Sequence, residues 1–308
     1  MLYGIKELRE KNIAFSILGE AEAARVMETE YGPRTLLSYV PLFPCYSGGE
    51  RRGQAIDVDC AYLYDLAVLD TELRKLVMAV CLDVEQSLRA VFLADCRRAG
   101  AEDRLVKDYV SSDAEYLHAA YAPDSVDILT RAPFAGVPIE DLPLSDFLEI
   151  LQFGSFQRLL RFFYSASAPA LYGRPAAPFE RDLDALRHIR NAAAHNTGLI
   201  SRLSQAEPFR RNLRLLSLLG RRGIRHKTLS TNIAKPVIHD LMSLVWLYRS
   251  LLPPPRTDQL RRQFSAFLEE RCTAHGAYYE KSPTLLSAHQ FLLQGIPALL
   301  SEASSPEL

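Results

Sequence analysis

The sequence is poor in the features that mark membrane-spanning and secreted proteins. No uninterrupted apolar run approaches the roughly 18 residues that a transmembrane helix needs. The first residues, MLYGIKELREKN, lack the apolar core of a signal peptide. Hydrophobic residues still make up 48% of the chain, enough to build a core. We therefore expect a folded cytoplasmic protein with no membrane partner.

Motifs that hold metals, nucleotides or covalent intermediates are also missing. The sequence has no glycine-rich phosphate loop, no H-E-x-x-H zinc motif and no G-x-S-x-G nucleophile motif. Its few cysteines form no C-x2-C pair and have no histidine at ligand spacing, so we expect structural thiols. The sequence predicts no metal and no cofactor. The cysteines are Cys45, Cys60, Cys81, Cys96 and Cys272.

Lysine is scarce, with 7 residues against 29 arginines, and the net charge is only −1. Basic charge is nevertheless concentrated in residues 202–227, which contain a single acid, Glu207. This segment is either a solvated, charge-rich helix and loop or a surface that binds nucleic acid. The candidate RNA-binding residues are Arg202, Arg210, Arg211, Arg214, Arg221, Arg222, Arg225 and Lys227.

Apolar residues recur at helical spacing along most of the chain. From Asp59 to about Arg98 the steps are three and four residues, with no proline, which predicts one long helix. Further helices are expected near 142–166 with a break at Gly154, and near 179–197, 207–219, 233–252, 257–275 and 284–303. No convincing β alternation is present. We predict an all-α helical bundle with extra helical segments at both ends.

The same pattern suggests three segments along the chain. Residues 1–57 form an N-terminal helical and loop segment, residues 58–252 form the helical bundle, and residues 256–308 form a C-terminal extension. The proline run at 253–255 separates the last two.

One short stretch, RNAAAH, combines residues that can act on a phosphodiester. Asn191 and His195 are four residues apart and share a helix face, and Arg190 stands beside Asn191. His188 lies near the same face. The spacing of Arg190 and His195 is weak by itself, because Arg221 and His226 repeat it. Three alanines between Asn191 and His195 leave room for a close partner, although they are also simply good helix formers.

These three side chains suit RNA cleavage. RNA carries its own nucleophile, the 2′-hydroxyl, next to the scissile phosphate. Arg190 can bind two phosphate oxygens and stabilise the charge that develops there. His195 can transfer a proton near neutral pH, and Asn191 can orient the imidazole or the phosphate. Two copies across a twofold axis would supply two histidines, one for each proton transfer.

RNAAAH resembles the R-N-x3-H motif of HEPN domains, which are all-α bundles whose enzymatic members are metal-independent ribonucleases. Other blocks, at residues 64–89, 142–156 and 183–200, resemble the Abi-like abortive-infection proteins of the AbiD/AbiF type. The resemblance covers about residues 1–252. Ser145 stands where the family often has tryptophan, and residues 196–202 follow its pattern loosely. The matching positions are Asp70, Leu73, Arg74, Glu85, Arg89, Glu149, Phe153 and Gly154.

The resemblance implies a homodimer, or a pseudo-dimer with a related chain, in which two R-x4-H helices form one composite ribonuclease site for antiphage defence. It also implies RNA as substrate, with a small noncoding RNA as a further partner that residues 202–227 could bind. Two alternatives remain: a non-catalytic HEPN-like RNA-binding module, and a regulatory helical protein in which the motif only joins two copies. Taken alone, Asp70–Arg74 and Glu85–Arg89 are most simply surface ion pairs; a packing or dimer role is the second interpretation and catalysis the third. His118, His239, His275 and His289 are expected to be satisfied or solvent-facing.

Overall fold

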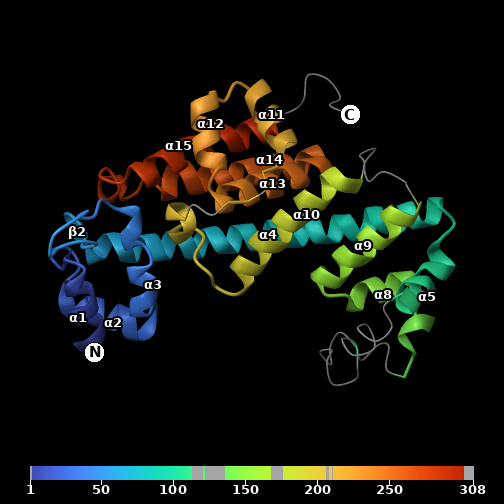
Figure 1. The fold of residues 1–308 in the computed structure, drawn as a ribbon, viewed down its shortest axis with the longest axis horizontal. Coiled ribbons are helices and arrows are strands. Elements are labelled where there is room, and N and C mark those ends of the chain that lie inside the picture. The colour runs from blue at the N-terminus through green and yellow to red at the C-terminus, as the bar shows by residue number, and fades with distance from the viewer. Residues whose placement is uncertain are drawn as a thin grey trace. The chain divides into compact units, whose positions relative to one another are not determined.

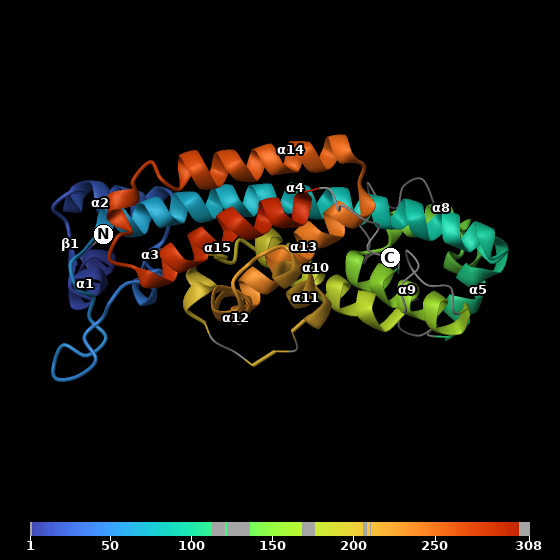
Figure 2. The same ribbon diagram turned by 90° about the horizontal axis from the view of Figure 1, so that it is seen from above.

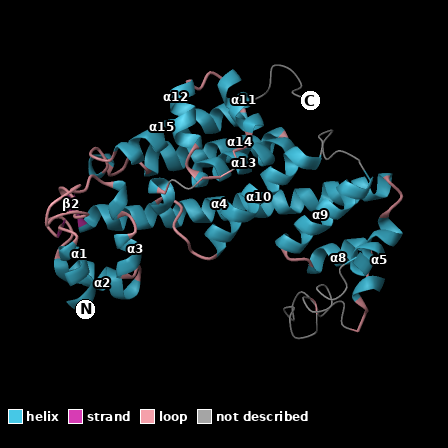
Figure 3. Cartoon of the chain, in the orientation of Figure 1, coloured by secondary structure: helices cyan, strands magenta, loops and turns pink. Residues whose placement is uncertain are grey.

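The computed structural model describes residues 2–112, 121, 136–167, 176–205, 208–209 and 211–301. Figure 3 shows that these residues are almost entirely helices joined by loops. Two short strands, β1 (Ile13–Ala14) and β2 (Val58–Asp59), pair in parallel. The predicted all-α class is confirmed. Among the described residues, no helix is long and apolar enough to span a membrane.

The chain divides into two compact units, each assembled from separate pieces of sequence. The first unit comprises Met1–Cys81 and His188–Ala303, and the second lies mainly within Leu82–Arg187. Both boundaries fall inside helices, namely α4 (Cys60–Arg98) and α10 (Ala176–Ala194). The segment boundaries expected near residues 57 and 252–256 stay a prediction.

The long helix expected from Asp59 onward is α4, which begins at Cys60 and ends at Arg98. Asp59 caps its first turn, because the carboxylate accepts a hydrogen bond from the Ala61 amide at 2.9 Å. The same carboxylate accepts the Ser16 amide at 2.7 Å and so ties the N-terminal segment to the helix. At the other end, Gly100 adopts a left-handed φ of 62°, which stops the helix.

The first unit surrounds the N-terminal half of α4 with helices from both ends of the chain (Figure 1). In this unit α15 packs against α12, α13 and α14 (Figure 2). The helix near 207–219 begins later than expected, because Asn212 caps it by accepting the amides of Arg214 and Leu215. The unit's helices are α1 (Leu2–Glu10), α2 (Glu20–Thr29), α3 (Pro33–Leu37), α11 (Leu213–Arg221), α12 (His226–Ile233), α13 (Pro236–Leu251), α14 (Pro254–Ser265) and α15 (Pro283–Leu300).

The second unit contains α5 (Glu102–Ser112), α8 (Leu144–Ile150) and α9 (Phe153–Ser167). Aromatic rings form its core: Phe92 meets Phe156 edge-on at 5.7 Å and Phe163 at 5.4 Å between ring centroids. The break predicted at Gly154 lies earlier, because the extended backbone of Leu151 ends α8 and Gly154 already belongs to α9.

Candidate active site at the end of α10

The R-x4-H residues lie at the C-terminal end of α10, not in its middle. The helix was expected to continue to about residue 197, but it ends at Ala194. Asn196 adopts a left-handed φ of 53°, and the Thr197 amide turns back to donate to the Ala192 carbonyl at 2.9 Å. This is the Schellman arrangement, which Asn supports better than most residues. His195 therefore stands at the helix terminus itself.

Arg190 and Asn191 meet, whereas His195 stands apart. The Arg190 Nη1 atom donates to Asn191 Oδ1 at 3.5 Å, and both side chains are half-buried. His195 is exposed, one helical turn after Asn191 on the same face. Its side chain makes no hydrogen bond or ion pair with any residue that the structure describes. The imidazole is thus accessible to a ligand or to a second copy of the chain.

A buried carboxylate on α4 holds the loop that follows His195. Asp70 is fully buried, and it accepts the Leu199 amide at 2.8 Å and the Tyr39 hydroxyl at 2.8 Å. The Ile200 amide also donates to it. Burial raises the pKa of Asp70, although these hydrogen bonds oppose the rise. Gly198 allows this approach, because a Cβ atom there would lie 2.8 Å from the carboxylate.

The interpretation of Asp70 and Arg74 as a surface pair is wrong. Arg74 Nη1 lies 3.6 Å from Asp70 Oδ1, but its side chain is only 11% exposed and that of Asp70 is 0% exposed. Asp70, with Arg74 beside it in the interior, anchors the loop after α10. Sequence reasoning missed this role because Leu199 is 129 residues away from Asp70, so its amide gave no local signal.

A second polar cluster lies on the His188 side of α10. His188 Nδ1 is 3.6 Å from Asp240 Oδ2, and His239 Nδ1 is 2.9 Å from the other Asp240 oxygen. His239 Nε2 accepts the Asn212 amide at 3.0 Å, so the proton of the neutral ring must sit on Nδ1 and point to Asp240. A cavity of about 70 Å³ lies here, lined in part by His188, Ala192 and Arg202.

The expectation for the other isolated histidines can be checked at three positions. His239 is satisfied as described, and His289 Nε2 lies 2.8 Å from the Leu268 carbonyl. His275 Nδ1 lies 3.1 Å from Asp65 Oδ1. His118 lies outside the described residues.

Comparison with known proteins decides the family. A model of the family described as Abi-like protein matches residues 42–201, which is more than half of the chain. The chain belongs to the Abi-like protein family. No curated protein and no solved structure matches it significantly. The matched region of this Abi-like protein contains Asp70 and the candidate site. It ends at residue 201, within the loop that follows His195.

Two further family-like positions, in the second unit, are packing residues. Arg89 lies 3.8 Å from Glu85 and donates to the carbonyls of Leu148 and Leu151, each at 3.3 Å. It thereby satisfies carbonyls at the end of α8. Arg89 also lies over the Phe156 ring at 5.3 Å. The surface interpretation of Glu85–Arg89 is wrong, because Glu85 is 5% exposed and the arginine is committed to α8.

The basic segment after α10 is only partly available to a ligand. The exposed cations are Arg202, Arg211, Arg221, Arg225 and Lys227, whereas Arg214 and Arg222 are half-buried. Arg222 donates to the Ser301 carbonyl at 3.4 Å, and Arg221 donates to Ser217 at 3.0 Å. Arg210 lies outside the described residues. Five of the seven candidate cations that the structure describes are therefore exposed.

The cysteines of this Abi-like protein have the character of buried thiols. Burial raises the pKa of Cys60, Cys96 and Cys272 to about 12, so they are protonated at neutral pH. None of the five cysteines forms a disulfide. The described residues contain no group of three or more His, Cys, Asp or Glu side chains that could hold a metal.

Proposed function

We propose that this Abi-like protein is a HEPN-type endoribonuclease acting in abortive infection, with Arg190, Asn191 and His195 as its catalytic residues. Family membership indicates the abortive-infection role. The ribonuclease assignment is carried by one observation: an exposed histidine at a helix terminus, one turn from a contacting Arg–Asn pair. The fixed loop behind it supports this assignment, because a catalytic group needs a rigid mount.

The proposed reaction uses the RNA itself as nucleophile. The 2′-oxygen attacks the adjacent phosphorus, the bond from phosphorus to the 5′-oxygen breaks, and the products are a 2′,3′-cyclic phosphate and a 5′-hydroxyl. Arg190 binds the non-bridging oxygens and stabilises their growing charge. His195 of one copy removes the 2′ proton, and His195 of a second copy protonates the leaving oxygen. The active species is therefore a homodimer.

The decisive experiment compares two histidine variants of the same spacing. His195→Ala removes the proposed catalytic group, whereas His226→Ala removes the exposed histidine of the second Arg-x4-His match. In EDTA, we expect wild type and His226→Ala to cleave RNA equally, and His195→Ala to lose at least about 100-fold in rate, the usual contribution of general acid–base catalysis. Equal activity of the two variants would overturn the assignment.

A non-catalytic RNA-binding function is the second candidate, favoured by the exposed cations that follow α10. Reversing Arg210, Arg211 and Arg214 to Glu tests it. If these residues contact phosphates, the reversal weakens RNA binding and lowers its salt dependence by about one unit of slope per lost contact. This candidate is preferred if the wild type binds RNA, cleaves none of it in EDTA, and loses affinity in the charge-reversed variant.

A further inference from the structure

An apolar cavity of about 220 Å³ lies in the first unit, behind the loop that follows α10. Its wall includes Leu69 from α4, Leu241 from α13 and Ala288 from α15. Ile189, which precedes Arg190, and Leu199, whose amide is held by Asp70, also line it. The cavity therefore touches both segments that carry the candidate site.

The lining contains no charged side chain, and most of its polar side-chain groups already have hydrogen-bond partners within the protein. His289 Nε2 is 2.8 Å from the Leu268 carbonyl, and the Thr273 hydroxyl donates to the Glu269 carbonyl at 2.6 Å. The Tyr279 hydroxyl is committed to Asp65. The Cys272 thiol is neutral, since burial raises its pKa to about 12. An occupant should therefore be uncharged and largely apolar, because a charged one would lose its hydration without compensation.

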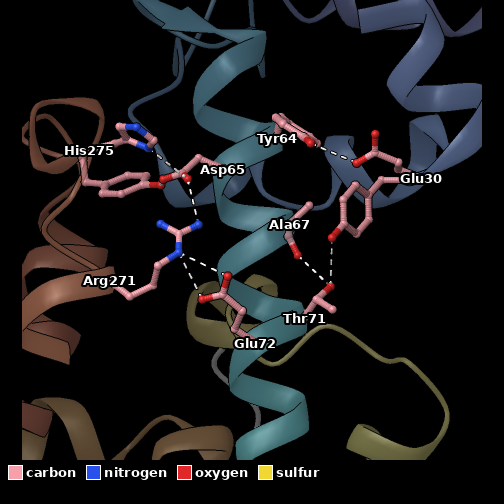
Figure 4. A network of polar contacts seen from close by, with 10 residues as sticks. Glu30, Tyr64, Asp65, Ala67, Thr71, Glu72, Arg271 and His275 are labelled. Carbon is pink, nitrogen blue, oxygen red and sulfur yellow. Dashed lines mark hydrogen bonds and ion pairs between the residues drawn. The ribbon is translucent and has the colours of Figure 1, made fainter. Parts of the chain in front are cut away.

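One wall of the cavity is a π-helix, Ala266–Arg271, that is fastened to α4. Arg271 Nε lies 3.1 Å from Glu72, and its Nη2 lies 3.3 Å from Asp65 (Figure 4). His275 Nδ1 reaches Asp65 at 3.1 Å. π-Helices are rare in proteins, and those that occur are often found at functional sites. The ion pairs of Arg271 and His275 with α4 thus hold this irregular wall of the cavity in place.

We propose that this cavity binds a small, uncharged, largely apolar molecule with one or two fused rings, and that the occupant further stabilises the loop Leu199–Leu203, whose last three residues begin the 3-10 helix Ser201–Ser204. The size follows from comparison, since a dry apolar cavity of about 150 Å³ holds benzene. The occupant would replace empty space against Ile189 and Leu199 with packing contacts. Because the loop follows His195, the occupant would also affect RNA cleavage, and this consequence rests on the proposed function. Ligand binding and the effect on the loop do not depend on it.

Indole is the probe that tests the proposal on the full chain. We expect saturable binding by calorimetry, a rise in melting temperature of about 2–4 °C at an excess of indole, and no effect of the charged analogue benzoate. Ala288→Leu fills the cavity and should abolish the indole effect. Ala298→Leu makes the same change on α15 outside the lining, and it should respond like the wild type.

Hydrogen exchange reports on the loop without any use of RNA. Indole should slow exchange of the amides at residues 199–203 in the wild type and in Ala298→Leu, but not in Ala288→Leu. Absence of saturable binding to the wild type, or an equal response of both variants, overturns the cavity as a ligand site. Binding without slower exchange overturns its link to the loop. Because neither readout needs cleavage, an inactive protein would still give a clear answer.

Discussion

Replacing Asp70 by alanine should release the loop that carries the end of the candidate site. The carboxylate is fully buried, and three donors converge on it: the Tyr39 hydroxyl and the amides of Leu199 and Ile200. Arg74 lies beside it at 3.6 Å. In the Asp70→Ala variant these donors lose their acceptor.

The cost can be worked from the groups left behind. Each buried donor without a partner costs about 1–3 kcal/mol, and the variant leaves three of them. The variant also removes the cost of burying the carboxylate, which is why the pKa of Asp70 is raised. We expect a net loss of about 3 kcal/mol in the free energy of unfolding. Tyr39→Phe, which removes one donor and leaves the rest, should cost about 1.5 kcal/mol.

Urea unfolding followed by circular dichroism measures these losses, with Asp258→Ala as the control. Asp258 forms an exposed pair with Arg261 at 2.8 Å, so its removal should cost less than about 0.5 kcal/mol. In Asp70→Ala, hydrogen exchange at the Leu199 amide should be faster than in the wild type at urea concentrations where both proteins are still folded. A loss below about 1 kcal/mol in Asp70→Ala, or an unchanged Leu199 amide, would refute the loop anchor.

Three further predictions follow from single contacts. Asn196→Ala should cost about 1 kcal/mol by thermal unfolding and Asn196→Gly should not, because φ is 53° there; equal effects would contradict the helix-stop assignment. Arg89→Ala should lower the urea stability by about 2 kcal/mol through two lost hydrogen bonds to α8, and Arg89→Lys should not restore it fully; a neutral Arg89→Ala would show the contacts to be incidental. Burial raises the pKa of Asp70 above its usual value, so the part of the stability that depends on its protonation is full below about pH 3.8 and is lost as pH rises through the native pKa, while the hydrogen bonds to the carboxylate remain; the urea midpoints of Asp70→Asn should lack this pH-dependent part, and identical pH profiles would exclude it.

The helices could largely be predicted from the sequence, because period and punctuation are local signals. The uninterrupted helical spacing from Asp59 to about Arg98 located α4 almost to the residue. Boundaries were missed where a specific contact decides them. Helix α10 ends before residue 197 because Asn196 adopts the left-handed conformation. Helix α11 begins after residue 207 because Asn212 caps its first turn. The two-unit organisation was not predicted, since it depends on contacts between distant segments.

The candidate site was predictable in its residues but not in its support. Arg190, Asn191 and His195 were selected by their chemistry and spacing, and the structure brings only the first two into contact. The role of Asp70 could not be read from i,i+4 spacing, because its burial depends on Tyr39 and on a loop far along the chain. Burial also changed the interpretation of Glu85–Arg89, from a surface pair to a packing contact.

The end groups of the cleaved RNA distinguish the proposed reaction, with the 2′-hydroxyl as nucleophile, from hydrolysis by water. Wild-type protein is incubated with a defined RNA in EDTA, and the new termini are identified by mass spectrometry. We expect 2′,3′-cyclic phosphates and 5′-hydroxyls, formed by the wild type and absent with His195→Ala. Termini that carry a 3′-hydroxyl and a 5′-phosphate, or the same products at the same rate from His195→Ala, would contradict the proposed reaction.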